Sequence, residues 1–532
     1  MPAHQSRPSV RSVKGMVAAA HPLAAAAGAA MLDSGGNAFD AIVATAAALN
    51  VTEPFMSGML GLGQSTFYPA SEGRVRTLDF HPPVPKRFPT DSIAKEATVD
   101  GPLAGGVPGN LAGWATLNKT YGRKSLAECF APAITLARDG FPISPFYLDI
   151  IEVCAKRRMS DGWAPIFAFD GAPKVGMVLR QPELADTLAT IAADGPGALY
   201  GGALGKRVVE ELAKMGGCIG MDDLEAVEPL WEDPVVAEFR GLSVHVPPPP
   251  AESFQFLTTL RLLAETDFSD LPHLGEEHLD RVFRAIRIAA ELRIRRNKAP
   301  VADIEALLSE ETLAPLRGRL TDGSPVWGRT EQYGDGPLAT GPSLKEHTTS
   351  FSAMDTDGNA VCITQSLGSP FGSGTVIPGT GLCLNNFMNW GDLSPSSPNF
   401  LKPGERFAMC LAPSVSTVDG KPVLCLGTPG SYGIPQTQSQ AMVHYLGYGL
   451  DLQAAIDAPR GRLWDGARVM LENRVPADVI EKLRARGHGV EVVGPVSWSA
   501  GGMHAVSRDP ETGAFAGAAD ARRDGAAVAA TR

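Results

Sequence analysis

The residues in this chain that could do chemistry begin with three hydroxyl side chains, Thr348, Thr349 and Ser350, at the head of a β-rich stretch. A threonine hydroxyl is a poor nucleophile until a neighbouring base removes its proton. Taken alone, such a run is typical of the exposed surface of an edge strand. Its meaning therefore depends on the elements that position it.

Those elements read as a β-hairpin. Residues Thr349 to Asp355 alternate polar and apolar side chains, an Asp-Gly-Asn turn follows, and a second β-rich run spans Ala360 to Leu367. A three-residue loop would set Thr348 opposite Ser366, whereas a two-residue turn would set Thr348 opposite Leu367. The sequence leaves both registers open.

The segment from Thr348 to Asn386 resembles the start of the small subunit in the gamma-glutamyltranspeptidase family of N-terminal-nucleophile hydrolases. The similarity rests on TTSFSAMDTDGNAV, where a threonine pair opens a strand, and on the later run LCLNN. The resemblance implies that the precursor cuts itself between His347 and Thr348, and that the freed α-amine is the base for the Thr348 hydroxyl. An α-amine titrates at about pH 8, so much of it accepts a proton at neutral pH. This chemistry needs no metal ion, and we expect no cofactor.

The resemblance also implies further site residues. Ser366 would hydrogen-bond Thr348, while Thr349 and Asn386 would lie in the substrate site. Gly430 and Ser431, in LCLGTPGSYGIPQT, take the positions whose backbone N–H groups hold the oxyanion. One such donor lowers the barrier by about 3 to 4 kcal/mol. Without the resemblance, the same residues are equally typical of a helix cap.

Arg87 is the candidate for gripping a substrate carboxylate. It follows a proline-rich loop, DFHPPVPKRFPTD, which restricts the directions in which the guanidinium can be aimed. A single arginine in a loop is usually solvated. Its spacing after the strand around Thr77 to Phe80 matches the arginine of the family, and the resemblance gives Arg87 that role.

The composition favours a globular protein that acts on a small molecule. The chain has 532 residues, is 44% hydrophobic and 20% charged, and carries a net charge of −11. A nucleic-acid surface needs clustered basic residues, so this charge argues against one. The seven cysteines are odd in number and form no C-x-x-C pair, which indicates neither a disulfide framework nor a zinc site. We interpret them as buried apolar residues in a reducing compartment.

The N-terminal region imitates a signal peptide, because Arg7, Arg11 and Lys14 precede the alanine-rich run Met16 to Leu32. His21-Pro22 interrupts that run, and its sequence resembles the first helices of mature family members. Alanine also contributes too little hydrophobicity for a membrane span. We therefore expect helices at Pro22 to Leu32 and at Ala38 to Leu49, in a cytoplasmic protein without a membrane partner.

Two later stretches carry weaker expectations. Glu276 to Asn297 has the spacing of a long amphipathic helix, and its six arginines indicate a solvated face. Those arginines are Arg281, Arg284, Arg287, Arg293, Arg295 and Arg296. The stretch from Ala299 to Glu346 is rich in turn residues, and we expect a mobile tail there once the chain is cut.

The resemblance covers nearly the whole chain and implies an α/β architecture, a four-layer αββα sandwich of the N-terminal-nucleophile hydrolase type. Residues 1–347 would form the large subunit and residues 348–532 the small subunit, together one αββα unit. The two fragments would stay associated as a heterodimer, and these could pair further. The rival from another class is a relative that has lost cleavage and serves as a scaffold. Intact Thr348, Thr349 and Ser366 argue against it.

The substrate expectation comes from positions where the chain departs from the family pattern. A gamma-glutamyl site holds the α-amine with an acidic residue and the carboxylate with a pair of serines. Here the acidic position aligns with Trp390, its polar neighbour with Phe387, and the serine pair with Met409 and Cys410. A buried ammonium without a partner costs several kcal/mol, so a glutamyl head group is disfavoured.

A short amide with a carboxylate and no α-amine fits better, and oxamate amidohydrolases of the family do such chemistry. A cephalosporin or glutaryl acylase, with a larger acyl chain in the apolar pocket, is the first alternative. True gamma-glutamyl transfer or glutathione hydrolysis is the second.

Overall fold

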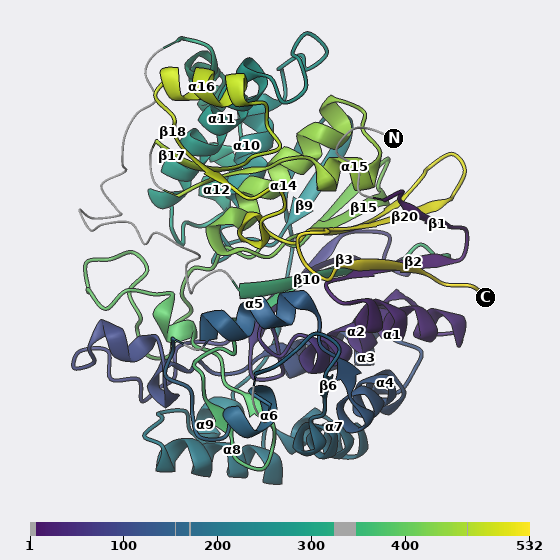
Figure 1. Cartoon of the computed structure of the whole chain (residues 1–532), viewed down its shortest axis with the longest axis vertical. Helices are drawn as coiled ribbons and strands as arrows, with labels where there is room; N and C mark the ends of the chain where they lie inside the picture. Colours follow the sequence, from purple (N-terminus) through teal and green to yellow (C-terminus); the bar gives the residue numbers. More distant parts are fainter. Residues whose placement is uncertain (1–6, 155, 170–171, 324–346, 465–466) are drawn as a thin grey trace.

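The structure, a computed structural model, describes residues 7–154, 156–169, 172–323, 347–464 and 467–532. Two seven-stranded sheets lie across the middle of the molecule, and helices cover the outer face of each (Figure 1). The order is therefore helix, sheet, sheet, helix. This confirms the four-layer αββα sandwich predicted from the sequence.

Sheet 1 has the strand order β1-β20-β19-β15-β14-β9-β8. Its strands are β1 (Val10–Ser12), β20 (Phe515–Ala519), β19 (His504–Arg508), β15 (Lys421–Gly427), β14 (Ser414–Val418), β9 (Leu242–Val246) and β8 (Val235–Phe239). Sheet 2 has the order β21-β2-β10-β11-β3-β4-β7. Its strands are β21 (Ala526–Ala529), β2 (Gly15–Ala19), β10 (His347–Asp355), β11 (Ala360–Gly368), β3 (Leu62–Tyr68), β4 (Arg76–Phe80) and β7 (Leu230–Glu232).

Both sheets draw strands from each side of Thr348. Sheet 2 places β10 and β11 at its centre between β2 and β3, and sheet 1 places β14 beside β9. The two sheets meet through a cluster of buried side chains that includes Met354 and Cys362 from sheet 2 and Cys425 and Val506 from sheet 1. A chain cut before Thr348 would thus remain one interlocked unit.

One helical layer packs on sheet 2, as the lower half of Figure 1 shows. Its helices are α1 (Pro22–Asp33), α2 (Ala38–Thr52), α3 (Asn110–Tyr121), α4 (Leu126–Asp139), α5 (Pro145–Cys154), α6 (Ala164–Phe167), α7 (Pro182–Asp194), α8 (Ala203–Lys214) and α9 (Met221–Leu224). The other layer packs on sheet 1. Its helices are α10 (Phe254–Leu263), α11 (Glu276–Ile294), α12 (Val301–Leu307), α13 (Glu310–Arg317), α14 (Ile434–Met442), α15 (Leu452–Asp457) and α16 (Ala477–Ala485).

Short strands complete the fold. They form the pairs β5 (Phe141–Pro142) with β6 (Val178–Leu179) and β12 (Val376–Ile377) with β13 (Leu382–Cys383), and the three-stranded sheet of β16 (Gly461–Leu463), β17 (Arg468–Glu472) and β18 (Gly489–Val493).

The first two helices occur where the sequence predicts them. Asn37 and Asp40 form a capping box that starts α2, and Pro22 lies in the first turn of α1. The two helices pack closely, since a Cβ placed on Gly28 would lie 2.3 Å from the Thr45 hydroxyl. The run Met16 to Leu32 thus belongs to β2 and α1 of the fold. The alternative that this run is a leader is wrong, because β2 pairs with β10 in sheet 2.

Two expectations, a solvated arginine face on residues 276–297 and a turn-rich tail after Ala299, are partly wrong. Arg284, Arg287 and Arg293 on α11 are buried, not solvated. Arg284 pairs with Asp280 one turn earlier on the same helix, whereas His488 contacts Arg287 and Glu252 contacts Arg293 from elsewhere in the chain. Residues 301–317 form α12 and α13 in place of a turn-rich tail. The remainder of that tail, residues 324–346, lies outside the described residues.

Candidate functional site

Thr348 lies near the start of β10, in the middle of sheet 2. The hairpin has the three-residue loop, because Asp355 and Asn359 close it through a 3.1 Å backbone hydrogen bond. The pairing register of β10 and β11 then shifts by one residue at Thr348, because His347 lies opposite Gly368 but Thr349 lies opposite Gln365. Strand β11 therefore has one extra residue opposite Thr348, a β-bulge of the kind that re-aims side chains near active sites.

Ser366 occupies the bulge and links the two residues of the expected cleavage site. The Thr348 hydroxyl donates to Ser366 Oγ at 3.3 Å. Ser366 Oγ in turn donates to the carbonyl oxygen of His347 and accepts from the backbone N–H of Gly368 at 2.8 Å. In the continuous chain, one serine thus polarises the carbonyl that Thr348 would attack and contacts the attacking hydroxyl.

Tight backbone packing holds this corner. A Cβ placed on Gly61 would lie 2.2 Å from the carbonyl oxygen of Ser366, and one on Gly63 would lie 2.6 Å from the Phe80 ring. The glycine-rich stretch from Ser57 therefore serves close packing.

Two charged side chains from distant parts of the chain contact Thr348 and Thr349. Glu53, the residue that ends α2, accepts a 2.9 Å hydrogen bond from the Thr349 hydroxyl through Oε2. Arg523, between β20 and β21, donates from Nη1 to the carbonyl oxygen of Thr348 at 3.0 Å. Burial raises the pKa of Glu53 to about 7, while Arg523 and Thr349 act in the opposite direction.

A buried ionic network fixes the loop that carries Arg523. Asp520 pairs with Arg460, and both Asp520 and Glu472 pair with Arg522. Asp520 also accepts from the backbone N–H of Met503. Since these groups are almost wholly buried, the network holds the loop in one position.

His347, the residue before the expected cut, has its imidazole buried against Trp498, with 5.5 Å between ring centroids. Burial, helped by the nearby charges of Arg523 and Arg157, holds the pKa of His347 well below its usual value. The ring is therefore neutral. Neither ring nitrogen has a hydrogen-bond partner among the described residues.

The turn expected to hold the oxyanion precedes α14. Gly430 has φ +122°, and Ser431 has φ +57°, which is uncommon for a residue with a Cβ. Their N–H groups have no acceptor within the described part of the chain. The turn lies beside Gly501, and Gly502 packs on Arg523, which holds the Thr348 carbonyl. Two donors without an acceptor among the described residues thus lie near the loop that carries Arg523.

An apolar wall borders the same corner. Phe387, Met409 and Cys410 belong to one buried cluster, and Trp390 packs against it. A Cβ placed on Gly368 would lie 3.4 Å from Trp390 Nε1, which puts the indole next to the loop held by Ser366. The indole N–H has no acceptor among the described residues.

Asn386 is engaged in structure. Its Oδ1 accepts from the backbone N–H of Ser369 at 2.9 Å, and its Nδ2 donates to the carbonyl oxygen of Val99 and to Ser369 Oγ. All its polar atoms are therefore used in holding the loop after β11. Any part that Asn386 plays toward a substrate acts through that loop.

A family model described as "Gamma-glutamyltranspeptidase" matches residues 24–530. The chain belongs to this family. A "Glutathione hydrolase-like YwrD proenzyme" from Bacillus subtilis (strain 168) is 35% identical over 537 residues, covering 98% of this chain and 99% of the relative. An "Acylase ACY 1 proenzyme" from Pseudomonas sp. (strain SE83) is 35% identical over 535 residues, covering 97% of this chain and 93% of the relative. An "Oxamate amidohydrolase proenzyme" from Klebsiella pneumoniae subsp. pneumoniae is 30% identical over 536 residues, covering 97% of this chain and 98% of the relative.

A solved structure agrees with this assignment. The cephalosporin acylase from Bacillus halodurans has a TM-score of 0.88 and 31% identity to this chain, covering 99% of this chain and 98% of that one. Members of the gamma-glutamyltranspeptidase family are self-processing amide hydrolases with an N-terminal nucleophile. The protein is therefore an enzyme of that type, and the interpretation of the chain as a scaffold is wrong.

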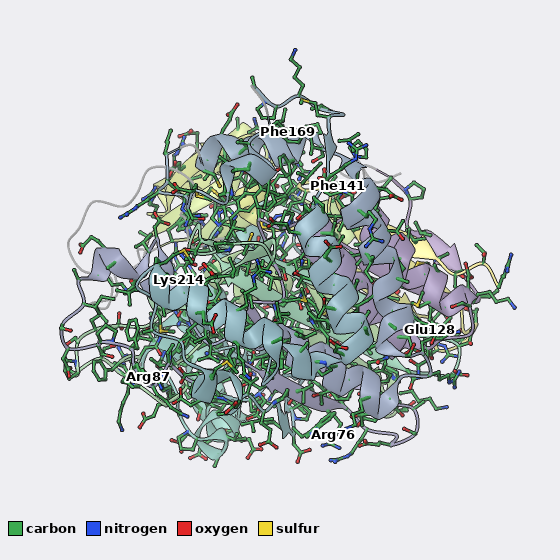
Figure 2. The ribbon with its side chains drawn as sticks, turned by 90° about the horizontal axis from the view of Figure 1, so that it is seen from below. Arg76, Arg87, Glu128, Phe141, Phe169 and Lys214 are labelled. Carbon is green, nitrogen blue, oxygen red and sulfur yellow. The ribbon has the colours of Figure 1, made fainter. Side chains whose placement is uncertain are left out.

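Arg87 lies apart from these contacts. Its side chain is 59% exposed and forms a 2.7 Å ion pair with Asp222 in α9. Figure 2 shows Arg87 toward the rim of the molecule. The next residue, Phe88, is buried in the same cluster as Phe387. A substrate carboxylate at Arg87 would share the guanidinium with Asp222 or replace it, and the role of Arg87 in this family member stays a prediction.

The sequence offered no signal for several residues near the nucleophile. Glu53 and Arg523 become neighbours of Thr348 only through the fold. Glu252 accepts from Arg293 Nη1 at 2.7 Å, and its backbone N–H donates to the carbonyl oxygen of Met409. A buried carboxylate therefore lies behind the apolar wall. It is already paired with an arginine from α11, the helix whose arginines the sequence analysis placed in solvent.

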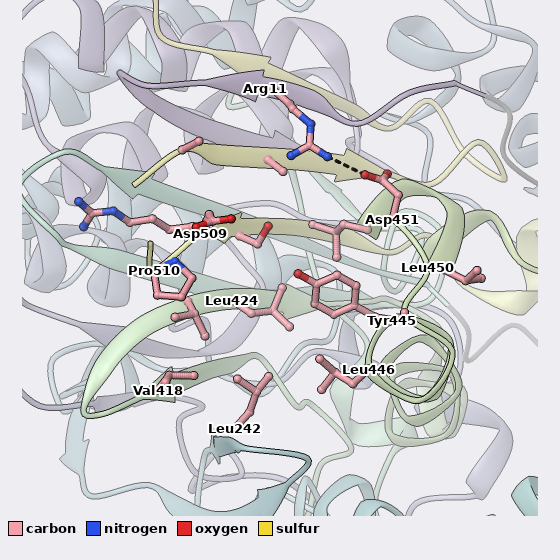
Figure 3. Close-up of a pocket in the computed structure, with 17 residues that line it drawn as sticks. Arg11, Leu242, Val418, Leu424, Tyr445, Leu446, Leu450, Asp451, Asp509 and Pro510 are labelled. Atoms are coloured by element: carbon pink, nitrogen blue, oxygen red, sulfur yellow. Dashed lines mark hydrogen bonds and ion pairs between the residues drawn. The ribbon is translucent and has the colours of Figure 1, made fainter. Parts of the chain in front are cut away.

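A pocket of about 550 Å³ lies elsewhere, on the outer side of sheet 1 (Figure 3). Leu242, Leu424, Tyr445 and Leu446 line it, and Asp451 forms a 2.9 Å ion pair with Arg11 at its edge. None of the site residues named above lines this pocket. Among the described residues, no helix is long and apolar enough to cross a membrane.

Proposed function

We propose that the protein is a self-processing amidohydrolase whose nucleophile is Thr348 and whose substrate is a small amide that carries a carboxylate but no α-amine, such as oxamate. The observation that carries the substrate part is the apolar wall. Phe387, Trp390, Met409 and Cys410 pack in one apolar cluster, and by the sequence resemblance they take the positions of the acidic residue, its polar neighbour and the two serines of a gamma-glutamyl site.

Maturation would begin in the continuous chain. The Thr348 hydroxyl attacks the carbonyl carbon of His347, whose oxygen is already hydrogen-bonded by Ser366. The C–N bond breaks, the Thr348 nitrogen takes a proton, and an ester joins His347 to Thr348. Water hydrolyses the ester, leaving the His347 carboxylate and a free Thr348 amine. The fragments have 347 and 185 residues and remain interlocked through both sheets.

Turnover would use the freed amine as base. It accepts the hydroxyl proton while Thr348 Oγ attacks the substrate carbonyl, and the proton then passes to the departing ammonia or amine. The N–H groups of Gly430 and Ser431 stabilise the oxyanion, since both lack another acceptor among the described residues. Water hydrolyses the acyl-enzyme. An oxamate-like substrate gives a dicarboxylate and ammonia.

Two alternatives have observations in their favour. Relatives described as acylases favour a larger acyl chain against the apolar wall. Gamma-glutamyl hydrolysis is favoured by Glu252, whose Oε2 has no hydrogen-bond partner among the described residues. Against it, Arg293 already neutralises Glu252 through Oε1, so a substrate ammonium would compete with a buried guanidinium.

The test compares oxamate-like amides, glutaryl amides and a gamma-glutamyl anilide, with kcat/KM measured for each. We expect the oxamate-like amides to be fastest, and Glu252→Gln to leave their kcat/KM nearly unchanged. Arg87→Ala should lower kcat/KM for every acid, and Asp222→Asn, which releases Arg87 from its ion pair, should raise it. Fast turnover of the gamma-glutamyl compound, or an Arg87→Ala enzyme with unchanged kcat/KM on all acids, would refute the substrate assignment.

A further inference from the structure

Glu53 is a buried carboxylate that the steps above do not use. Its side chain is almost wholly inside the protein, Oε2 accepts from the Thr349 hydroxyl, and Oε1 has no hydrogen-bond partner among the described residues. A half-satisfied buried carboxylate is costly, so its presence beside a nucleophile calls for a specific reason.

The groups that face Glu53 identify that reason. Arg523 lies close enough to lower its pKa, and the same guanidinium donates to the Thr348 carbonyl oxygen. Asp524 acts in the opposite direction, and the Thr349 hydroxyl favours the ionised form. Glu53 and Arg523 therefore hold two adjacent residues, one through a side chain and the other through a backbone carbonyl.

Cleavage makes this anchoring more important. Before the cut, Thr348 is fixed by the chain on both sides. After the cut, its only covalent tether is the bond to Thr349, and its amine must stay next to its own hydroxyl. A displacement of about 1 Å in such a group costs about 100-fold in rate.

We propose that Glu53 is a positioning residue for the mature nucleophile: its ionised carboxylate balances Arg523 and anchors Thr349, so that the Thr348 amine and hydroxyl are held in reacting geometry. The inference rests on the proposed role of Thr348. Glu53 touches neither substrate nor reacting atoms in this arrangement, and it acts through Thr349 and Arg523.

The ionisation of Glu53 gives the proposal a signature. Its pKa of about 7 lies below the value of about 8 expected for the amine. In the wild type, kcat should fall at acid pH through two ionisations, because protonated Glu53 no longer offers a negative charge to Arg523 and accepts less strongly from the Thr349 hydroxyl. KM should change little, since Glu53 contacts Thr349 and does not belong to the apolar cluster of Phe387, Met409 and Cys410.

The experiment measures kcat and KM from pH 5 to 9 on matured enzyme, with the N-terminus of the small fragment checked. Glu53→Gln keeps the shape and an acceptor for Thr349 but removes the charge. We expect kcat to fall about tenfold or more at pH 8, KM to stay within about twofold, and the ionisation near pH 7 to disappear. Thr349→Val should lower kcat but keep that ionisation, because the carboxylate remains. Glu305→Gln removes an exposed carboxylate and should match the wild type.

An unchanged kcat profile in Glu53→Gln, or identical profiles in Glu53→Gln and Thr349→Val, would overturn the proposal. If Glu53→Gln yields no folded enzyme, Glu53→Asp decides: it should keep the ionisation at a lower kcat, and a profile without it refutes the inference. Thr348→Ala distinguishes a failure of the proposed function from a failure of the role proposed for Glu53. Turnover by Thr348→Ala would refute the proposed function itself, whereas an inactive Thr348→Ala beside an unchanged Glu53→Gln refutes only the role of Glu53.

Discussion

The two sides of Thr348 are built on opposite principles. On one side, Ser366, Glu53 and Arg523 each hydrogen-bond the nucleophile or a neighbouring residue. On the other, the wall of Phe387, Trp390, Met409 and Cys410 presents aromatic rings and sulfur atoms. If Thr348 is the nucleophile as proposed, the polar side would govern how fast an acyl group is transferred, and the apolar side would govern which acyl group fits. Substitutions on the two sides should therefore change different kinetic parameters.

The strongest test of this comparison removes the nucleophile from the polar side. Thr348→Ala should leave one uncut 55.9 kDa chain and lower kcat by about 10⁴-fold or more, because no other hydroxyl can both cut the chain and form the acyl-enzyme. Gel electrophoresis and turnover of the best amide check it. Thr348→Ser should keep slow cleavage, since the hydroxyl remains. A fully active wild type that runs as a single uncut chain would contradict the mechanism.

The next largest effect should come from the oxyanion turn. Gly430 has φ +122°, which residues with a Cβ rarely adopt, so Gly430→Ala should shift the two N–H donors. We expect kcat to fall about 100-fold with little change in KM. Gly404→Ala is the matched control, because Gly404 also has a positive φ, of +80°, but lies in an exposed loop with open space around it. Equal losses in both variants would mean that strain, not the donors, causes the effect.

The local sequence pattern was sufficient to predict much of the structure on the polar side of Thr348. The alternation in β10 and β11 and the Asp-Gly-Asn turn predict the hairpin, and the observed three-residue loop is one of the two registers that pattern allows. The bulge then places both Ser366 and Leu367 opposite Thr348, which neither simple register anticipates. A one-residue slip depends on contacts at the end of the ladder, such as Gly61 against Ser366, and these join residues about three hundred positions apart.

Ion pairs between distant parts of the chain could not be predicted from the sequence. The spacing of residues within α11 suggested that Arg293 is solvated, because the sequence of one helix does not reveal partners outside it. The partner of Arg293, Glu252, comes from another part of the chain. The ion pair of Arg87 was equally hidden, since its partner Asp222 lies in α9. Glu53 and Arg523 have ordinary sequence surroundings and acquire meaning only when α2 and the loop after β20 meet at β10. The family resemblance supplied the nucleophile, but not these supporting charges.

The apolar side can be tested by giving it the charge it lacks. Trp390→Asp puts a carboxylate beside Gly368, where a glutamyl ammonium could pair with it. We expect kcat/KM for a gamma-glutamyl anilide to rise about tenfold, the value of one charge-assisted hydrogen bond, and kcat/KM for oxamate-like amides to fall. Trp390→Asn, similar in size to aspartate but neutral, should show no such gain. A gain in Trp390→Asn equal to that in Trp390→Asp would show that space, not charge, controls selection.

The smallest effect is on stability, and it sharpens the interpretation of Glu53. Burial raises the pKa of Asp79 to about 6, with Arg406 opposing, and burial together with Asp79 raises the pKa of Glu232 to about 8. A carboxyl whose pKa is raised by folding binds its proton more tightly in the folded state. Its stabilisation is therefore present below the unfolded value of about 4 and is lost as pH rises through the folded values.

Glu53 adds to the same trend, whereas buried histidines such as His278, His347 and His504, whose pKa values burial lowers, act in the opposite direction between pH 5 and pH 8.5. The test is therefore the change that a single carboxyl makes. Between pH 5 and pH 8.5, at constant ionic strength, the Tm of Glu232→Gln should rise by a few degrees more, or fall by a few degrees less, than the Tm of the wild type. Glu305→Gln should follow the wild type. Identical changes of Tm with pH in Glu232→Gln and the wild type would contradict the raised pKa of Glu232.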